Sequence, residues 1–392
     1  MMLDNNQQAF FALVRVGLWA DTTVHGEGFL DEPSGKAGRK IHGAEQVDWE
    51  KVYQLAEEQS VVGIVLAGIE KSNIKPPQEL LLQWIGEVQI IEQQNLTMNK
   101  FVAKFISFLR KNDVYTLLVK GQGIAQCYER PMWRACGDVD LLLSAENYSK
   151  AKKVLTPLAS NVDDENIERK HLAMKIDNWT VELHGTMFGG WSKRVDKLVG
   201  EAQDDCFLSG SVRSWDNSET QVFLPSPNND VIFVFTHILQ HFFIEGIGLR
   251  QICDWCRLIW TYRDDLDLGL LEKRLTSANL MPKWKSFATL AVEYLGMDPQ
   301  IMPFYSADAK WKRKADNILP LILETGNFGH ARDMSYKGKV GLVERLYISL
   351  KRHTHDGYVR ARVFPQDAVR VWSCEMGKAV KEIVRGRITV QQ

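Results

Sequence analysis

The chain has 392 residues, a formal net charge of −1 at pH 7, and 45% hydrophobic and 25% charged residues. This composition is typical of a folded globular protein and excludes a disordered, collagen-like or rod-forming chain. The near-neutral charge gives no sign of a polyanionic partner for the molecule as a whole. The length exceeds what one hydrophobic core usually serves, so we expect two or three packed units.

The compartment is predicted from the cysteines and the N-terminal segment. Six cysteines are scattered along the chain rather than spaced as a disulfide framework, which favours a reducing compartment. Asp4 stands where a signal peptide carries positive charge, and Arg15 interrupts the apolar stretch that follows. No segment reaches the roughly 18 consecutive apolar residues of a membrane span. We therefore expect a cytoplasmic protein with no membrane partner.

The first part of the chain has a helical pattern. Apolar residues recur at three- and four-residue spacing over residues 6–20 and 47–110, and the last helix of this part is expected over 77–109. A glycine-rich stretch predicts a loop over residues 26–43. The first predicted unit is therefore an N-terminal helical region, residues 1–110.

From residue 111 the pattern becomes that of a small α/β unit, predicted to end at about residue 200. Short β-favouring runs alternate with helix-compatible stretches, and Ser144 suits the N-cap of one helix. Asp177 and Asn178 separate two further β-favouring runs, which predicts a hairpin. The expected order is strand, helix, strand, helix and hairpin, over residues 114–119, 122–129, 138–143, 145–158 and 168–184.

Residues 201–392 are expected to form a C-terminal helical domain. Residues 201–225 are predicted to be a connection or a pair of short strands, and Pro227 is typical of a first helical turn. Residues 331–392 carry thirteen Lys or Arg against six Asp or Glu. This basic segment either attracts phosphate or nucleic acid or forms a solvated helix surface. The predicted fold class is α+β, with a small core between two helical regions.

Asp138 and Asp140 are the first candidate site residues. They lie two apart on a predicted strand, so their side chains share a face. Carboxylates this close repel each other unless a cation lies between them, and Mg²⁺ prefers oxygen ligands together with waters and substrate phosphates. The pair indicates a site for a nucleoside triphosphate bound through its metal, although an isolated Asp-x-Asp is also common at solvated strand edges.

Two nearby features strengthen this interpretation. The Lys-Gly-Gln-Gly sequence from Lys120 to Gly123 follows a strand and opens a helix. Such a sequence offers backbone N–H groups and a cation to phosphate, or is an ordinary turn. Glu182 and His184 share a face of a later strand, so Glu182 is available as a third carboxylate. In two-metal phosphoryl transfer a third acid supports the second ion or deprotonates the attacking hydroxyl.

Other polar and aromatic residues have simpler interpretations. His237 and His241 are four apart on a predicted helix, a spacing that can bind zinc, but the stretch lacks HExxH and a third ligand. Packing is the simpler role, with a contact to the active-site cleft as the alternative. Cys253 and Cys256 form one CxxC without a second pair and are interpreted as core residues. Trp133 is close enough to the Asp pair to suggest stacking on a base.

The sequence from Leu118 to Ala125, followed by Arg134 and a Gly-Asp-Val-Asp-Leu-Leu run, resembles the uncharacterised nucleotidyltransferase family of the DNA polymerase β-like superfamily. The acid-x-His strand of that family is matched by Glu182-Leu-His184. The resemblance covers roughly residues 50–260. It extends to a helical segment, and the residues that it suggests for the cleft are His184, His237, His241, Arg250 and Asp254.

The resemblance implies transfer of a nucleoside monophosphate from an NTP, expected to be ATP, to an unknown acceptor with release of pyrophosphate. The catalytic residues and the ligands of Mg²⁺ or Mn²⁺ would be Asp138, Asp140 and Glu182. The nucleotide-binding residues would be Lys120, Gly121, Gly123 and Arg134. In this scheme the glycines let the backbone approach phosphate, Arg134 neutralises the leaving pyrophosphate, and Lys120 either does the same or pairs with a neighbouring carboxylate.

The chain departs from the superfamily pattern at two points. A Gly-Ser or Gly-Gly pair is usual where this chain has the sequence from Lys120 to Gly123, and Asp is common in place of Glu182. Two alternatives stay open: a catalytically inactive nucleotide-binding or regulatory module of the same fold, and a transferase that modifies RNA ends. The three acids favour an active enzyme, since a degenerate copy is expected to lose one. RNA is supported only by the basic C-terminal segment.

Overall fold

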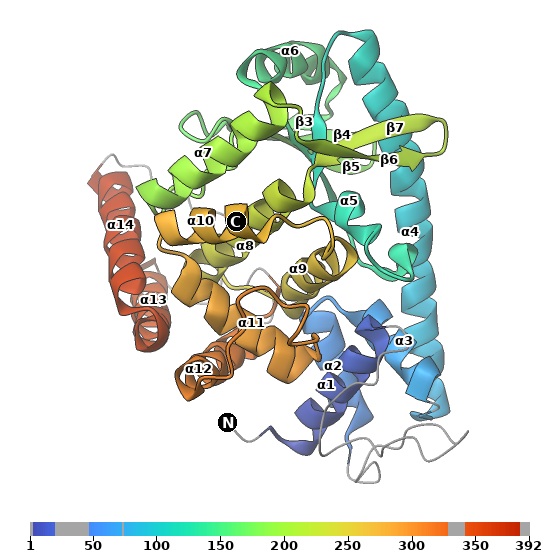
Figure 1. Ribbon diagram of the computed structural model, residues 1–392, viewed down its shortest axis with the longest axis vertical. Coiled ribbons are helices and arrows are strands. Elements are labelled where there is room, and N and C mark those ends of the chain that lie inside the picture. The colour runs from blue at the N-terminus through green and yellow to red at the C-terminus, as the bar shows by residue number, and fades with distance from the viewer. Residues whose placement is uncertain (1–2, 20–46, 73, 328–341, 385–392) are drawn as a thin grey trace.

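The computed structural model describes residues 3–19, 47–72, 74–327 and 342–384 (Figure 1). The loop predicted over residues 26–43 and part of the basic C-terminal segment lie outside these residues. In chain order the elements are α1 (Asn5–Leu18), α2 (Trp49–Glu58), α3 (Val62–Ser72), α4 (Gln78–Lys111), β1 (Leu117–Val119), α5 (Gly121–Ala125), the 3-10 helix η2 (Pro131–Trp133), β2 (Asp138–Leu142), α6 (Ala145–Leu155), η3 (Thr156–Leu158), β3 (Asn161–Val162), β4 (His171–Ile176), β5 (Trp179–His184), α7 (Lys193–Leu208), β6 (Val212–Asn217), β7 (Thr220–Pro225), α8 (Pro227–Ile244), α9 (Leu249–Thr261), α10 (Leu268–Ser277), α11 (Met281–Leu295), α12 (Ala309–Thr325), α13 (Leu342–Val363) and α14 (Pro365–Val384).

The N-terminal helices pack tightly on one another. Asp4 and Gln7 form a capping box that begins α1. A Cβ atom at Gly17 of α1 would lie 1.8 Å from the Ile64 carbonyl oxygen, and one at Gly68 of α3 would lie 2.1 Å from the Leu13 carbonyl oxygen. Only glycine permits this backbone approach. The long helix α4 then runs along one side of the molecule and reaches the sheet (Figure 1).

A mixed sheet forms the centre of the α/β part, with strand order β1-β2-β5-β4-β3. β2 is antiparallel to β1 and parallel to β5, while β4 pairs antiparallel with both β5 and β3. The parallel register places Asp140 opposite Glu182. A separate hairpin is formed by β6 and β7. The central pair, β2 and β5, therefore carries the polar residues of interest side by side.

Strand alternation separates an apolar face of the sheet from a polar one. Val139, Leu141, Val181 and Leu183 belong to a buried cluster that also contains residues of α4 and α6. The alternate positions carry the acidic residues and face the opposite way, because successive side chains of a strand point to opposite faces. Burial of the apolar face thus fixes the direction of the acids.

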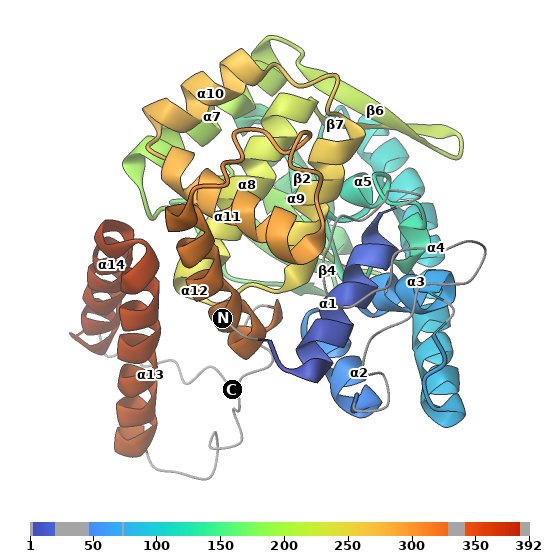
Figure 2. The same ribbon diagram turned by 60° about the horizontal axis from the view of Figure 1, so that its bottom comes forward.

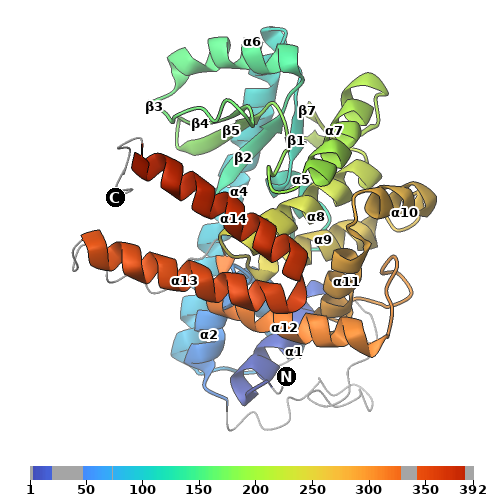
Figure 3. The same cartoon turned by 90° about the vertical axis from the view of Figure 1, so that its left-hand side faces the viewer.

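Helices of the C-terminal part cover the polar face of the sheet. At their centre Phe235, Trp255 and Trp284 are buried, with ring centroids 4.7–5.2 Å apart. α13 and α14 lie side by side (Figure 3), at the edge of the molecule opposite α4 (Figures 1 and 2). In the described part of the chain, no helix combines the length and apolarity needed to cross a membrane.

The α+β class predicted from the sequence is confirmed, and so is the hairpin of β4 and β5. The pair of short strands predicted as one option for residues 201–225 is present as β6 and β7, but residues 201–208 are helical because α7 continues to Leu208. α7 buries Val195, Val199 and Cys206 on one face. α5 is shorter than predicted and ends at Ala125. The division into three units stays a prediction, although one buried cluster draws residues from all three.

Candidate active site

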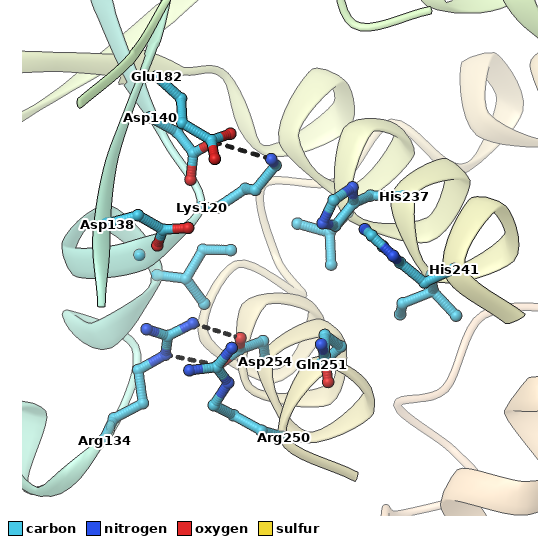
Figure 4. A pocket seen from close by; sticks show the side chains of 14 residues that line it. Lys120, Arg134, Asp138, Asp140, Glu182, His237, His241, Arg250, Gln251 and Asp254 are labelled. Carbon is cyan, nitrogen blue, oxygen red and sulfur yellow. Dashed lines mark hydrogen bonds and ion pairs between the residues drawn. The ribbon is translucent and has the colours of Figure 1, made fainter. Parts of the chain in front are cut away.

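A cavity lies between the polar face of the sheet and the helices α8 and α9 (Figure 4). The strands and the turn after β1 contribute Lys120, Gly121, Asp138, Asp140 and Glu182. The opposite walls contain His237 and His241 of α8 and Arg250, Gln251 and Asp254 of α9, and Arg134 also contributes. Ten of the twelve residues that the sequence suggested for the site therefore line one cavity, and the two exceptions are Gly123 and His184.

The turn after β1 places a lysine over the acids. Lys120 has φ 57° and ψ −146°, a conformation that is unfavourable for a residue with a side chain. Gly121 follows with φ 39°, and a Cβ there would lie 3.2 Å from the Cys136 Sγ. The Lys120 ammonium donates to Asp140 Oδ1 over 2.9 Å. The strained turn thus positions an ammonium group in direct contact with Asp140.

Asp140 is the most buried of the three acids, with 2% of its side chain exposed. Burial opposes its ionisation, but the Lys120 ammonium and the hydrogen bond donated by His184 Nε2 over 2.7 Å outweigh this effect and lower its pKa. The same ion pair raises the pKa of Lys120 against the effect of burial. Asp140 is therefore a carboxylate ion in the folded protein.

Asp138 behaves in the opposite way. The negative charge of Asp140, together with burial, raises the pKa of Asp138 to about 6, and Lys120 offsets only part of this effect. No hydrogen bond to the Asp138 side chain was found among the described residues. We call the part of the cavity lining that contains Asp138, Asp140 and Glu182 the acidic wall. Its carboxylates carry more negative charge than the neighbouring cationic side chains neutralise.

Glu182 is supported by two imidazoles. His171 Nε2 lies 3.1 Å and His184 Nε2 lies 3.4 Å from Glu182 Oε2. Burial raises the pKa of Glu182, but these hydrogen bonds and Lys120 lower it well below its ordinary value. Burial and Lys120 lower the pKa of His184, whereas its bonds to Asp140 and Glu182 raise it, and the net shift is upward. His171, His184, Glu182 and Asp140 form one connected network.

Two arginines lie at the base of the cavity. Arg134 binds Asp254 in bidentate fashion, with Nε–Oδ1 and Nη2–Oδ2 distances of 2.9 and 2.6 Å, and the Tyr128 hydroxyl also donates to Asp254. Arg250 donates from Nη1 to the Ala135 carbonyl oxygen, and its Nε has no hydrogen-bond partner. Within the described ranges, Arg250 forms no ion pair with a carboxylate. Arg250 is therefore more available to an anionic ligand than Arg134.

Some sequence-based roles differ from the positions observed. Gly123 does not line the cavity, and a Cβ there would lie 2.6 Å from Leu224 Cδ2, so its small size serves packing. His237 lines the cavity, and burial lowers its pKa well below the ordinary value, which keeps the ring neutral. Trp133 Nε1 donates to Glu92, and its ring stacks with Arg130 outside the cavity lining.

The interpretation of the CxxC residues as core residues agrees with the structure, since Cys253 and Cys256 are both fully buried. Two further polar residues, one beside the acids and one in the opposite wall of the cavity, were not identified from the sequence. His171 was detectable, because a hairpin turn at Asp177 pairs residue 171 with His184. Gln251 carried no local signal, and its side-chain oxygen has no hydrogen-bond partner in the cavity wall.

The fold and the cavity define an α+β protein in which acids on two adjacent parallel strands face a helical cover. The sequence profile of a family described as uncharacterised nucleotidyltransferases matches residues 45–296, which is more than half of the chain. The chain belongs to this family. The match includes every residue of the cavity described above. No curated protein and no solved structure is detectably similar to the chain.

Proposed function

We propose that the protein is a metal-dependent nucleotidyltransferase of the DNA polymerase β-like superfamily. It transfers a nucleoside monophosphate from an NTP, expected to be ATP, to an acceptor and releases pyrophosphate. A bond forms between an acceptor oxygen and the α-phosphorus, and the bond from that phosphorus to pyrophosphate breaks. The acceptor proton passes to solvent or to a carboxylate of the cavity. The observation that carries the proposal is the convergence of Asp138, Asp140 and Glu182 on one cavity wall.

The donor set suits Mg²⁺ or Mn²⁺. The three side chains offer carboxylate oxygens, which hard divalent cations prefer. The pKa of Asp138 is raised to about 6 mainly by Asp140, so uncompensated negative charge is concentrated where a cation is proposed. Such an ion, when bound to Asp138, Asp140 and Glu182, supplies charge neutralisation of the triphosphate and polarisation of its phosphoryl oxygens.

The remaining polar residues of the cavity supply anion binding. Lys120 donates to Asp140, and its ammonium could contact a phosphate if a metal ion were bound by that carboxylate. Arg250, which has an unpartnered Nε, is the guanidinium best suited to the pyrophosphate portion. Arg134 is already held by Asp254, and we propose that it supports the cavity wall and not the leaving group.

The alternatives from the sequence predict other outcomes. An inactive nucleotide-binding module would bind an NTP with Mg²⁺ but transfer nothing. An RNA-end-modifying enzyme would bind RNA with an affinity that falls steeply as salt rises. RNA is supported only by the basic C-terminal segment, and no described residue of that segment lines the cavity, so we favour a non-nucleic-acid acceptor.

Nucleotide binding tests the proposal without knowledge of the acceptor. Calorimetric titration with a non-hydrolysable ATP analogue should give Mg²⁺-dependent binding to the wild type, weakened at least about tenfold in Asp138→Asn/Asp140→Asn, because triphosphate binding depends on the metal. Asp177→Asn is the matched control, since Asp177 is an exposed turn residue with φ 51°, which Asn tolerates.

Transfer is tested with α-labelled NTPs, Mg²⁺ or Mn²⁺, and fractionated cell extract. The wild type and Asp177→Asn should label an acceptor and release pyrophosphate, and the double variant should do neither. Binding without transfer in every fraction would favour the inactive module. Absence of Mg²⁺-dependent nucleotide binding to the wild type would refute the proposed function.

A further inference from the structure

A nitrogen-rich cluster lies next to the acidic wall. His171 begins β4 and His184 ends β5, and the antiparallel register places them directly opposite each other. Glu182 precedes His184 by two residues and so shares its face of β5. Backbone pairing within one hairpin therefore holds the three side chains together.

Both imidazoles approach the same carboxylate oxygen. The His171 Nε2 and His184 Nε2 atoms lie 3.1 and 3.4 Å from Glu182 Oε2, and the two ring centroids are 4.8 Å apart. One potential ligand atom from each of the three residues lies within 4.8 Å of the other two. Over the ranges that the structure describes, this is the one group of three His, Cys, Asp or Glu side chains that meets this distance.

These atoms match the demands of zinc better than those of magnesium. Zn²⁺ binds imidazole nitrogen and carboxylate oxygen at about 2.0–2.2 Å, so the ligand atoms of a tetrahedral site are roughly 3.3–3.5 Å apart. The measured separations of 3.1 and 3.4 Å are within a few tenths of an ångström of that range. Imidazole ligands favour zinc and neighbouring transition metals, whereas Mg²⁺ favours oxygen.

We propose that His171, Glu182 and His184 form a binding site for a zinc-class transition-metal ion, adjacent to the proposed magnesium site and sharing Glu182 with it. Three protein ligands leave the fourth position of a tetrahedral ion open. The site is accessible, because 35% of the His171 side chain is exposed, while 10% of His184 is. Both ions need Glu182, so zinc inhibits magnesium-dependent chemistry; this consequence rests on the proposed function.

A simpler role predicts different behaviour. If the two histidines only support Glu182 by hydrogen bonds, zinc has no specific affinity for this part of the molecule. The two roles are distinguished by direct metal binding, which requires no nucleotide. The result is therefore independent of whether the chain transfers nucleotides.

The test is a titration of the metal-free full-length protein with Zn²⁺ against a chromophoric chelator. Cys374 is exposed and thiolates bind zinc, so every protein in the test carries Cys374→Ser. In this background we expect one bound Zn²⁺, with affinity reduced at least about tenfold by His171→Ala or His184→Ala, because each removes one of three ligands. His355→Ala, at an exposed position of α13, is the matched control and should leave the affinity unchanged.

Two further measurements separate this site from its neighbours. Co²⁺ should give the visible absorption of a four-coordinate ion in the wild type and lose it in His171→Ala. Asp138→Asn should retain zinc binding, since Asp138 is not one of the three ligands. Circular dichroism confirms that each variant is folded. His171→Ala is the least disruptive of the ligand variants, because His171 is only half-buried whereas His184 is 10% exposed. Equal zinc affinity of the wild type and His171→Ala would overturn the proposal.

Discussion

Replacing Asp138 by asparagine should stabilise the metal-free protein. The Asp138 carboxylate lies beside the negative charge of Asp140 and is partly buried, and both effects raise its pKa from the ordinary 3.8 to about 6. Asparagine has nearly the same shape but no charge. The substitution therefore removes the electrostatic repulsion between Asp138 and Asp140, which destabilises the wild type but is a feature of its proposed metal site.

The magnitude follows from the two pKa values. A difference between 3.8 and about 6 corresponds to roughly 3 kcal/mol at pH 8, where Asp138 is ionised in both the folded and the unfolded chain. Solvent screening makes this an upper limit. The folded state binds more protons than the unfolded state between about pH 4 and 6, so the cost of Asp138 grows as pH rises through that window. At pH 5 the same values give roughly 1.6 kcal/mol.

Urea unfolding followed by circular dichroism in the presence of a chelator measures the effect. The free energy of unfolding of Asp138→Asn should exceed that of the wild type at pH 5, and the excess should grow by about 1.4 kcal/mol up to pH 8. Asp177→Asn, at an exposed turn, should show no such pH-dependent gain. Millimolar Mg²⁺ should stabilise the wild type more than Asp138→Asn. The difference in the free energy of unfolding between the two proteins should therefore shrink or change sign.

The opposite result would refute this electrostatic argument. If Asp138→Asn is less stable than the wild type without metal, or if the difference does not change between pH 5 and pH 8, the two aspartates do not repel each other in the folded protein. The same outcome would weaken the case for a cation between them.

Three further substitutions test the charges around the cavity. Lys120→Met leaves the buried Asp140 carboxylate with less compensation and should cost roughly 3–5 kcal/mol, measured by urea unfolding. Asp254→Asn should cost a similar amount, because it leaves the Arg134 guanidinium buried without its carboxylate partner. The double variant Arg134→Met/Asp254→Leu removes both charges and should recover much of that stability. A double variant that is as unstable as Asp254→Asn, or less stable, would contradict this argument. Arg250→Gln should cost about 1 kcal/mol of stability, because it loses the hydrogen bond to the Ala135 carbonyl oxygen, but should weaken ATP-analogue binding about 10- to 100-fold by calorimetry. Unchanged affinity would exclude Arg250 from phosphate binding.

Local sequence patterns predicted much of the fold, because helix and strand periodicity depends on residues close in the chain. The shared face of Asp138 and Asp140 follows from strand alternation alone, and the hairpin register follows from the turn at Asp177. α7 was not predicted, and irregular structure was expected from residue 201, although Val199 and Cys206 belong to the buried face of this helix. Gly123 was assigned to phosphate binding, whereas its small size makes room for Leu224 of β7. That contact was not predictable, because β7 is distant from Gly123 in the sequence.

The amino-acid sequence by itself determined the α+β class, the family, and the identity of the acids that line the cavity. Only the tertiary structure decided that Asp140 lies opposite Glu182, that Arg134 is held by Asp254, and that His171 joins the network. Each of these pairings depends on strand order or helix packing between distant segments. The free energies that select such contacts are spread over the buried core, so no local motif encodes them.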